Sequence, residues 1–237
     1  MSQLIFYGGA SIQGTDHDEN QDAWCVIGHR SRDRGILVVL ADGVSVTPFG
    51  RWAAEQACRK MREAYNGSQF FNQKVILQTI KALDETVRAK GKGQAACTLS
   101  FCWIVSGKCT MFKLGDSPVC HVRNGVGSFV APAEDALFLK SYIGMGDKLI
   151  EELRLHELRL LAEDWLVLTS DGVSDVLTAA ELGNLCMLAE GDLNVVAQKI
   201  THYAQLRGSK DDATAVILNY KDRPSSRLAY EAFFILG

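Results

Sequence analysis

Two segments of this sequence share one pattern, which constrains the fold more than any other feature. The apolar run ILVVLA at 36–41 leads into Asp42-Gly43, and the run WLVLT at 165–169 leads into Ser170-Asp171-Gly172. Short apolar runs rich in β-branched residues are typical of strands buried on both faces. A carboxylate at the end of such a strand is costly to desolvate unless a cation meets it. The pattern therefore raises the hypothesis that Asp42 and Asp171 share a metal ion.

Other acidic residues also lie beside predicted strand ends or in glycine-containing turns: Asp22, Asp116, Asp211 and Asp212. Hard divalent cations prefer oxygen ligands. If the strands are neighbours in a sheet, their ends can gather these groups at one edge, and two ions there could activate water for phosphoester hydrolysis. The alternative is that each Asp-Gly pair is only a turn, because Asp and Gly are common turn residues.

The order of predicted elements favours an α+β sandwich. Three strands (4–10, 22–27, 36–41) precede two helices, the first opening at Pro48 and ending near residue 65 and the second spanning 75–91. Strands follow at 95–105, 109–114, 119–123, 127–130, 153–160 (with a bulge or turn) and 165–169, then helices at 178–188 and 193–206 and a strand at 213–220. Turn signals at 106–108 and 124–125 predict hairpins and mainly antiparallel pairing. We expect one domain over 1–220 and a tail over 221–237.

Composition narrows the class of protein. The chain has 237 residues, of which 47% are hydrophobic, so it can bury a sizeable core. The net charge of −3 gives no electrostatic reason to expect nucleic acid or an anionic membrane as a partner. The N-terminus lacks a signal-peptide pattern and no apolar stretch is long enough to span a membrane, so we expect a cytoplasmic protein. Seven cysteines without CxxC spacing predict buried thiols rather than a zinc site or disulfide framework.

A series of motifs, in order, resembles those of the metal-dependent protein phosphatases, the protein phosphatase 2C family of Ser/Thr phosphatases. The motifs are SIQGTDHDENQDAW, VLADGVS, ACTLSFCWI, FKLGDSPVCHVRNG, SYIGMG, LVLTSDGVSDVLT and KDDATAVIL. The resemblance extends over about residues 4–220. It implies a four-layer α-β-β-α sandwich, in which two antiparallel sheets are flanked by helices and metal ions bind at one end.

The resemblance also implies roles for individual residues. Asp42 would bridge two Mg²⁺ or Mn²⁺ ions, with the Gly43 carbonyl binding one of them and Asp171 and Asp211 the other, which makes Asp42, Asp171 and Asp211 the catalytic set. A third, weaker metal site of bacterial-type members would be formed by Asp116, Asp171 and Asp175. Asp22 and Gln21 would hold metal-bound water.

Several positions depart from the family pattern. His17 stands where the family has its phosphate-binding arginine, so we expect His17 to contact phosphate. Val44-Ser45 replaces the usual second glycine, Pro118 the usual arginine, and Asp212 the usual asparagine. The segment APAEDALFLK at 131–140 leaves little room for the family's flap.

Three functions differ in how well they fit these residues. The leading hypothesis is a phosphoprotein phosphatase that hydrolyses phosphoserine and phosphothreonine by direct attack of metal-bridged water, opposing a Ser/Thr kinase. The alternative is a non-catalytic module on the same fold that binds a phosphoprotein or another partner, which the change at His17 and the missing flap motivate. An unrelated two-metal nuclease is disfavoured because the chain lacks a basic surface.

Overall fold

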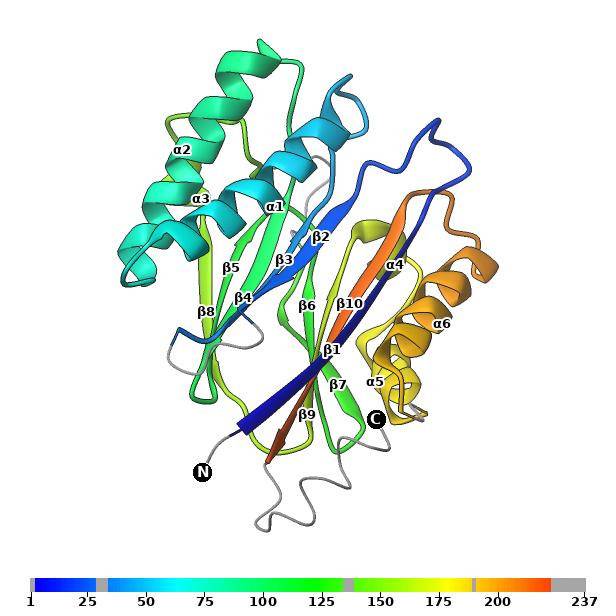
Figure 1. The fold of residues 1–237 in the computed structure, drawn as a ribbon. Coiled ribbons are helices and arrows are strands. Elements are labelled where there is room, and N and C mark those ends of the chain that lie inside the picture. Colours follow the sequence, from blue (N-terminus) through cyan, green and yellow to red (C-terminus); the bar gives the residue numbers. More distant parts are fainter. Residues whose placement is uncertain (1–2, 29–33, 134–138, 189–190, 223–237) are drawn as a thin grey trace.

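Two antiparallel sheets packed face to face form the centre of the molecule (Figure 1). The computed structural model describes residues 3–28, 34–133, 139–188 and 191–222. Within these ranges, each sheet has five strands, and every pairing between strands is antiparallel. The antiparallel pairing predicted from the hairpin turns is thus confirmed.

The strands of the two sheets come from interleaved parts of the chain. The first sheet has the order β1 (Gln3–Ile12), β10 (Ala213–Asp222), β9 (Asp164–Thr169), β6 (Val119–Arg123) and β7 (Val126–Ala131). The second has the order β2 (Ala23–Ile27), β3 (Ile36–Ala41), β4 (Leu99–Val105), β5 (Lys108–Leu114) and β8 (Arg154–Arg159).

Helices cover the outer face of each sheet and complete four layers (Figure 1). Helices α1 (Gly50–Gly67) and α2 (Gln73–Gly91) lie over the second sheet, and α5 (Ala179–Met187) and α6 (Leu193–Leu206) lie over the first. Two one-turn helices, α3 (Leu149–Glu152) and α4 (Asp171–Ser174), lie in connections. The predicted α-β-β-α sandwich is confirmed.

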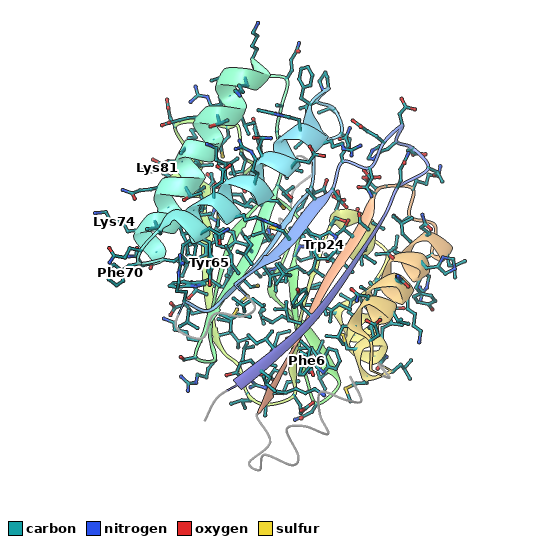
Figure 2. The ribbon with its side chains drawn as sticks, viewed as in Figure 1. Phe6, Trp24, Tyr65, Phe70, Lys74 and Lys81 are labelled. Atoms are coloured by element: carbon teal, nitrogen blue, oxygen red, sulfur yellow. The ribbon has the colours of Figure 1, made fainter. Side chains whose placement is uncertain are left out.

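The core has three apolar layers that match this architecture. One fills the space between the sheets, and Trp24 lies there, between β2 and the strands of the other sheet (Figure 2). The other two layers lie beneath the α1–α2 pair and the α5–α6 pair. Strand β3 has apolar neighbours on both faces and is buried throughout, as its continuous apolar run predicted.

Some predicted elements need correction. Helix α1 begins at Gly50, not at Pro48, and β4 begins at Leu99, four residues after the predicted start. The bulge or turn expected within 153–160 is wrong, because β8 pairs with β5 in unbroken register from Arg154 to Arg159. The leucine pattern there slips for another reason: Leu158 packs in the core between the sheets, whereas Leu155 is 43% exposed.

The prediction that the cysteines are buried thiols is confirmed, whereas the predicted location and domain bounds stay predictions. All seven cysteines are free thiols, and all except the half-buried Cys58 are buried. Within the described ranges, no helix is both long and apolar enough to cross a membrane. The cytoplasmic location and the division into a domain over 1–220 and a tail over 221–237 stay predictions. Strand β10 continues to Asp222, whereas residues 223–237 and half of the segment 131–140 lie outside the described residues.

Candidate active site

The acidic residues singled out in the sequence lie at one end of the sandwich. Asp42 follows β3, and Asp22 precedes its antiparallel partner β2, so both lie at the same end of the second sheet. Asp171 follows β9, and Asp211 precedes its antiparallel partner β10, at one end of the first sheet. Asp116 lies in the connection that crosses from β5 in the second sheet to β6 in the first.

The two Asp-Gly strands are not neighbours in one sheet, which corrects the geometry considered from the sequence. Strand β3, which leads to Asp42, belongs to the second sheet, and β9, which leads to Asp171, belongs to the first. The carboxyl groups of these two residues are nevertheless close enough that each affects the pKa of the other. The carboxylates therefore meet across the gap between facing sheets, not along one sheet edge.

Backbone contacts hold each Asp-Gly segment in place. The Asp42 carbonyl accepts a hydrogen bond from Thr98 N at 2.7 Å, and Gly43 N donates to the Gln21 carbonyl at 3.2 Å. A side chain on Gly43 would overlap Gly50, so the glycine allows the start of α1 to approach the strand end. Asp171 is the first residue of α4 and is followed by Gly172, which packs against the Asp212 carbonyl.

Burial and mutual repulsion disfavour ionisation of these carboxyl groups. Burial raises the pKa of Asp42 well above its ordinary value, and four neighbouring carboxylates add to this effect: Asp22, Asp171, Asp211 and Asp116. Burial also raises the pKa of Asp171 to about 7, with charges on Asp211 and Asp116 acting in the same direction. Burial also raises the pKa of Asp175, with the charge of Asp211 acting in the same direction.

Asp22 adds a further buried carboxylate at the head of β2. Burial raises its pKa to about 8, although hydrogen bonds from Thr214 and Ser170 oppose the shift. Thr214 Oγ1 donates to Asp22 Oδ2 at 2.6 Å, which fixes the orientation of the carboxyl group. The adjacent Gln21 donates its backbone N–H to Asp212, and its Oε1 atom is buried without a hydrogen-bond partner among the described residues.

Unpartnered oxygens show that these residues fit a divalent cation. The Oδ1 atoms of Asp22 and Asp171 are buried, and neither has a hydrogen-bond partner in the described part of the chain. Buried polar atoms are normally satisfied, so such an oxygen calls for a ligand. A hard cation such as Mg²⁺ or Mn²⁺ takes carboxylate oxygens and favours their ionised form, which offsets the raised pKa values.

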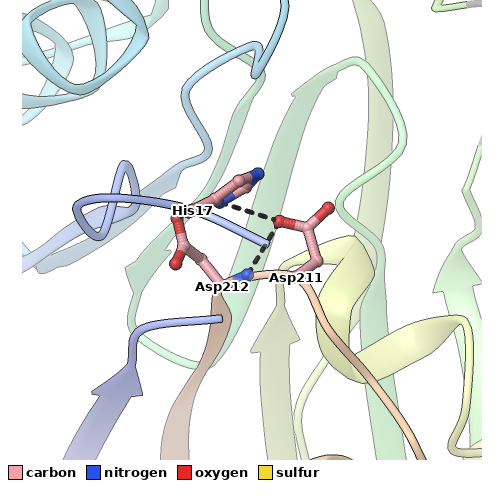
Figure 3. Close-up of side chains that lie close together, drawn as sticks. All are labelled: His17, Asp211 and Asp212. Atoms are coloured by element: carbon pink, nitrogen blue, oxygen red, sulfur yellow. Dashed lines mark hydrogen bonds and ion pairs between the residues drawn. The ribbon is translucent and has the colours of Figure 1, made fainter. Parts of the chain in front are cut away.

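His17 lies at the edge of this carboxylate group (Figure 3). Its Nδ1 atom is 2.9 Å from Asp212 Oδ2 and 3.4 Å from Asp211 Oδ1. Burial lowers the pKa of His17, but the hydrogen bond to Asp212 and the charges of both aspartates outweigh it, so the pKa is raised. Ligand atoms of the three residues lie within 4.8 Å of one another.

A family model supplies the identification. The model described as protein phosphatase 2C matches residues 13–206, which is most of the chain. The chain belongs to the protein phosphatase 2C family. This confirms the resemblance drawn from the motifs. No curated protein sequence matches the chain significantly.

Solved structures with the same fold include bacterial phosphatases of this family. PppA, described as a key regulatory component of T6SS in Pseudomonas aeruginosa, is 20% identical with a TM-score of 0.74, over 92% of this chain and 98% of that one. The S. agalactiae serine/threonine phosphatase is 20% identical with a TM-score of 0.77, over 91% and 99%. The catalytic domain of PstP, in complex with two manganese ions, is 17% identical with a TM-score of 0.79, over 93% and 100%. At these identities the likeness shows the fold.

Three residues of this phosphatase 2C site were missed as site residues in the sequence. Asp212 is one of the acidic residues that the sequence places beside a strand end, but no role of its own is predicted for it, and the structure places it in contact with His17. Thr214 and Ser170 were not singled out, yet Thr214 Oγ1 donates to Asp22 Oδ2 and Ser170 Oγ donates to the Asp212 carbonyl. Thr214 Oγ1 also lies 2.6 Å from Ser11 Oγ. Hydroxyl residues at strand ends are too common for sequence alone to indicate such contacts.

Proposed function

We propose that this chain is a metal-dependent phosphoprotein phosphatase that hydrolyses phosphoserine and phosphothreonine. The observation that carries this proposal is the group of carboxylates between the ends of the two sheets, with buried and unpartnered oxygens on Asp22 and Asp171 within the described ranges. A group of this kind is costly to bury unless cations bind it. Family membership and the solved phosphatases of the same fold support the same function.

The residues that would hold two core Mg²⁺ or Mn²⁺ ions are Asp42, the Gly43 carbonyl, Asp171 and Asp211. A third ion would use Asp116, Asp171 and Asp175. When bound, such ions supply an activated water for attack on phosphorus and offset the charge on the phosphate oxygens. Asp22 would orient this water, because Thr214 Oγ1 donates to its Oδ2 and leaves Oδ1 to accept a hydrogen bond.

We propose that water attacks the phosphorus atom directly, because the cysteine nearest to Asp42 along the strand pairing is a poor nucleophile. Cys97 forms a backbone bridge with Gly43, the residue that follows Asp42. Burial raises the pKa of its thiol, with the nearby Asp84 charge acting in the same direction. The reactive thiolate is therefore disfavoured at this position, so a covalent cysteine intermediate is not expected.

The first test replaces the proposed metal ligands. Asp42→Ala and Asp171→Ala should each abolish Mn²⁺-dependent hydrolysis of 4-nitrophenyl phosphate, a loss of at least about 100-fold, because each removes a ligand from the centre of the site. Asp147→Ala is a matched control, since the Asp147 side chain is fully exposed. Full activity in both site variants would refute the proposal.

The substrate class needs a separate experiment. We propose phosphorylated proteins as substrates, opposing a Ser/Thr kinase. Incubation of a phosphorylated proteome with the wild-type protein and Mn²⁺ should deplete phosphoserine and phosphothreonine but leave phosphotyrosine unchanged. The Asp42→Ala variant is the control. Depletion of phosphotyrosine alone would contradict the proposed specificity.

The second candidate function is a non-catalytic module that binds a phosphoprotein or another partner. The phosphate-binding arginine of the family is replaced by His17, whose Nδ1 is already bonded to Asp212. Calorimetry with Mn²⁺ separates the two functions. Binding that depends on Asp42 and Asp171 supports the phosphatase, whereas no binding would favour the module.

A further inference from the structure

The side chain of Asp212 binds the opening segment of the chain, residues 13–21, which lies between β1 and β2. Its side chain is only 2% exposed. Its Oδ1 accepts from Gly14 N at 2.8 Å, and its Oδ2 accepts from Gln21 N at 2.7 Å and lies 2.9 Å from His17 Nδ1. Three groups from separate positions of the opening segment are thus bound to one carboxylate.

Neighbouring contacts hold the same two segments together. Asp16 N donates to the Lys210 carbonyl at 3.1 Å, and Gln13 Nε2 donates to the His17 carbonyl at 2.8 Å. A side chain at Gly14 would overlap the Lys210 carbonyl oxygen, so the two backbones are in direct contact there. The position of the His17 ring is therefore set by the loop before β10 as well as by its own segment.

The orientation of the imidazole follows from these contacts. Asp212 Oδ2 already accepts from Gln21 N, so this oxygen is an acceptor and Nδ1 of His17 is assigned as the donor in this bond. The other ring nitrogen, Nε2, lies on the side of the ring remote from Asp212 (Figure 3). In this arrangement Nδ1 anchors the ring, and in the protonated ring Nε2 is a second donor for an anionic ligand beside the carboxylate site.

We propose that Asp212 is a positioning residue, which anchors His17 through Nδ1 and thereby directs Nε2 toward the phosphate of the substrate. This inference rests on the proposed function, because it assigns the contact that replaces the arginine of the family pattern. Asp212 itself need not touch the substrate. Its effect on phosphate binding passes through His17.

A double-mutant cycle tests this coupling. His17→Gln keeps an N–H donor for Asp212 but lacks the second ring nitrogen, and Asp212→Asn has one carbonyl oxygen for three donors. Each variant should raise KM for 4-nitrophenyl phosphate about tenfold with kcat within about twofold, the size of one hydrogen bond to a charged group. The double variant should raise KM no further than either single variant, because both remove the same contact.

A matched control and a second probe separate positioning from general damage. Asp192→Asn changes an aspartate that caps α6 through Asn194 N, and asparagine caps equally well, so KM should not change. The affinity of the Mn²⁺-loaded protein for inorganic phosphate should fall about tenfold in His17→Gln and Asp212→Asn but not in the control. Thermal melting identifies any variant that fails to fold, and His17→Gln remains informative if Asp212→Asn does not fold.

Nuclear magnetic resonance gives a readout that needs no catalysis. The Nδ1 hydrogen of His17 should be visible and slow to exchange in the wild type and in Asp192→Asn, and lost in Asp212→Asn. Absence of this signal in the wild type, or KM effects that multiply in the double variant, would overturn the proposal. If the signal and phosphate binding behave as expected but no hydrolysis occurs, the positioning stands and the proposed catalytic function fails.

Discussion

Individual buried carboxylates differ in whether their oxygens have partners, and this difference marks the site. Asp84 is 3% exposed, and its Oδ1 accepts hydrogen bonds from Gly144 N and Gly146 N at 2.6 and 3.3 Å. Asp164 is likewise surrounded by donors. In contrast, Oδ1 of Asp22 and of Asp171 has no such partner within the described ranges. Ordinary structural carboxylates in this fold are thus satisfied by the chain, whereas those between the strand ends need a ligand.

Asp164 supports a prediction about pH and stability. It is 1% exposed, and its two oxygens accept from Arg123 Nε and Nη2 at 2.8 and 2.6 Å and from Leu161 N at 2.7 Å. Burial opposes its ionisation, but the bonds from Arg123, Leu161 and His121 prevail, so the pKa is lowered. Asp164→Asn should therefore reduce the free energy of unfolding at pH 7 by roughly 2 kcal/mol, a discounted value because Arg123 is partly exposed.

The sign of the pH dependence follows from the lowered pKa. The stabilisation by Asp164 is complete above the unfolded-state pKa and is lost as pH falls through the folded-state pKa. Urea unfolding at pH 7 and at decreasing pH should show the wild type and Asp164→Asn converging in stability in the acid range. Asp147→Asn, at an exposed position, should match the wild type throughout. A gap for Asp164→Asn that widens on acidification would contradict this account.

At the scale of elements, glycines mark where a helix and a strand approach closely. A side chain at Gly127 in β7 would overlap the Ala179 carbonyl oxygen at the start of α5. Gly127→Ala should therefore lower the free energy of unfolding by about 1–3 kcal/mol, because the strand and the helix must separate. A methyl group at Gly67, at the end of α1, would meet open space, so Gly67→Ala is the matched control and should be neutral or slightly stabilising. Equal effects of the two substitutions in urea unfolding would show that the close approach is unimportant.

Elements with strong local signals were predicted well, and those without were not. The bounds of β3 and α6 match the prediction, because a continuous apolar run and a helical apolar period define them. Thr178 and Glu181 form the capping box expected from their spacing. Helix α4 was missed because Asp171-Gly172 also fits a turn, and the slip in β8 was misinterpreted because an edge strand can carry an exposed leucine.

At the scale of the whole molecule, the sequence indicated which residues end strands but not which sheets those strands join. Strand pairing depends on contacts between distant segments, such as β1 with β10, which no local pattern encodes. The four layers were therefore expected from the family resemblance and not from the residues alone. The contact of His17 with Asp212 could not be predicted from local patterns either, because it joins residues that are 195 positions apart in the sequence.

The position of the carboxylates between the two sheets gives a prediction for the stability of the whole molecule. Without metal, Asp42 is a buried carboxylate beside four others, so it opposes the packing of one sheet end against the other. Asp42→Asn removes the cost of either ionising or protonating this carboxyl group in the folded state, and should raise Tm in a chelator by a few degrees, since about 1 kcal/mol corresponds to roughly 2–4 °C for a domain of this size.

Mn²⁺ should reverse this order. At a concentration about 100 times Kd, bound metal stabilises the wild type by roughly 2.7 kcal/mol, whereas Asp42→Asn lacks the proposed bridging ligand and should gain little. Melting curves of both proteins in chelator and in Mn²⁺ should therefore cross. Asp147→Asn should follow the wild type in both conditions. If Asp42→Asn instead gains as much from Mn²⁺ as the wild type does, then Asp42 is not the residue through which the metal joins the two sheets.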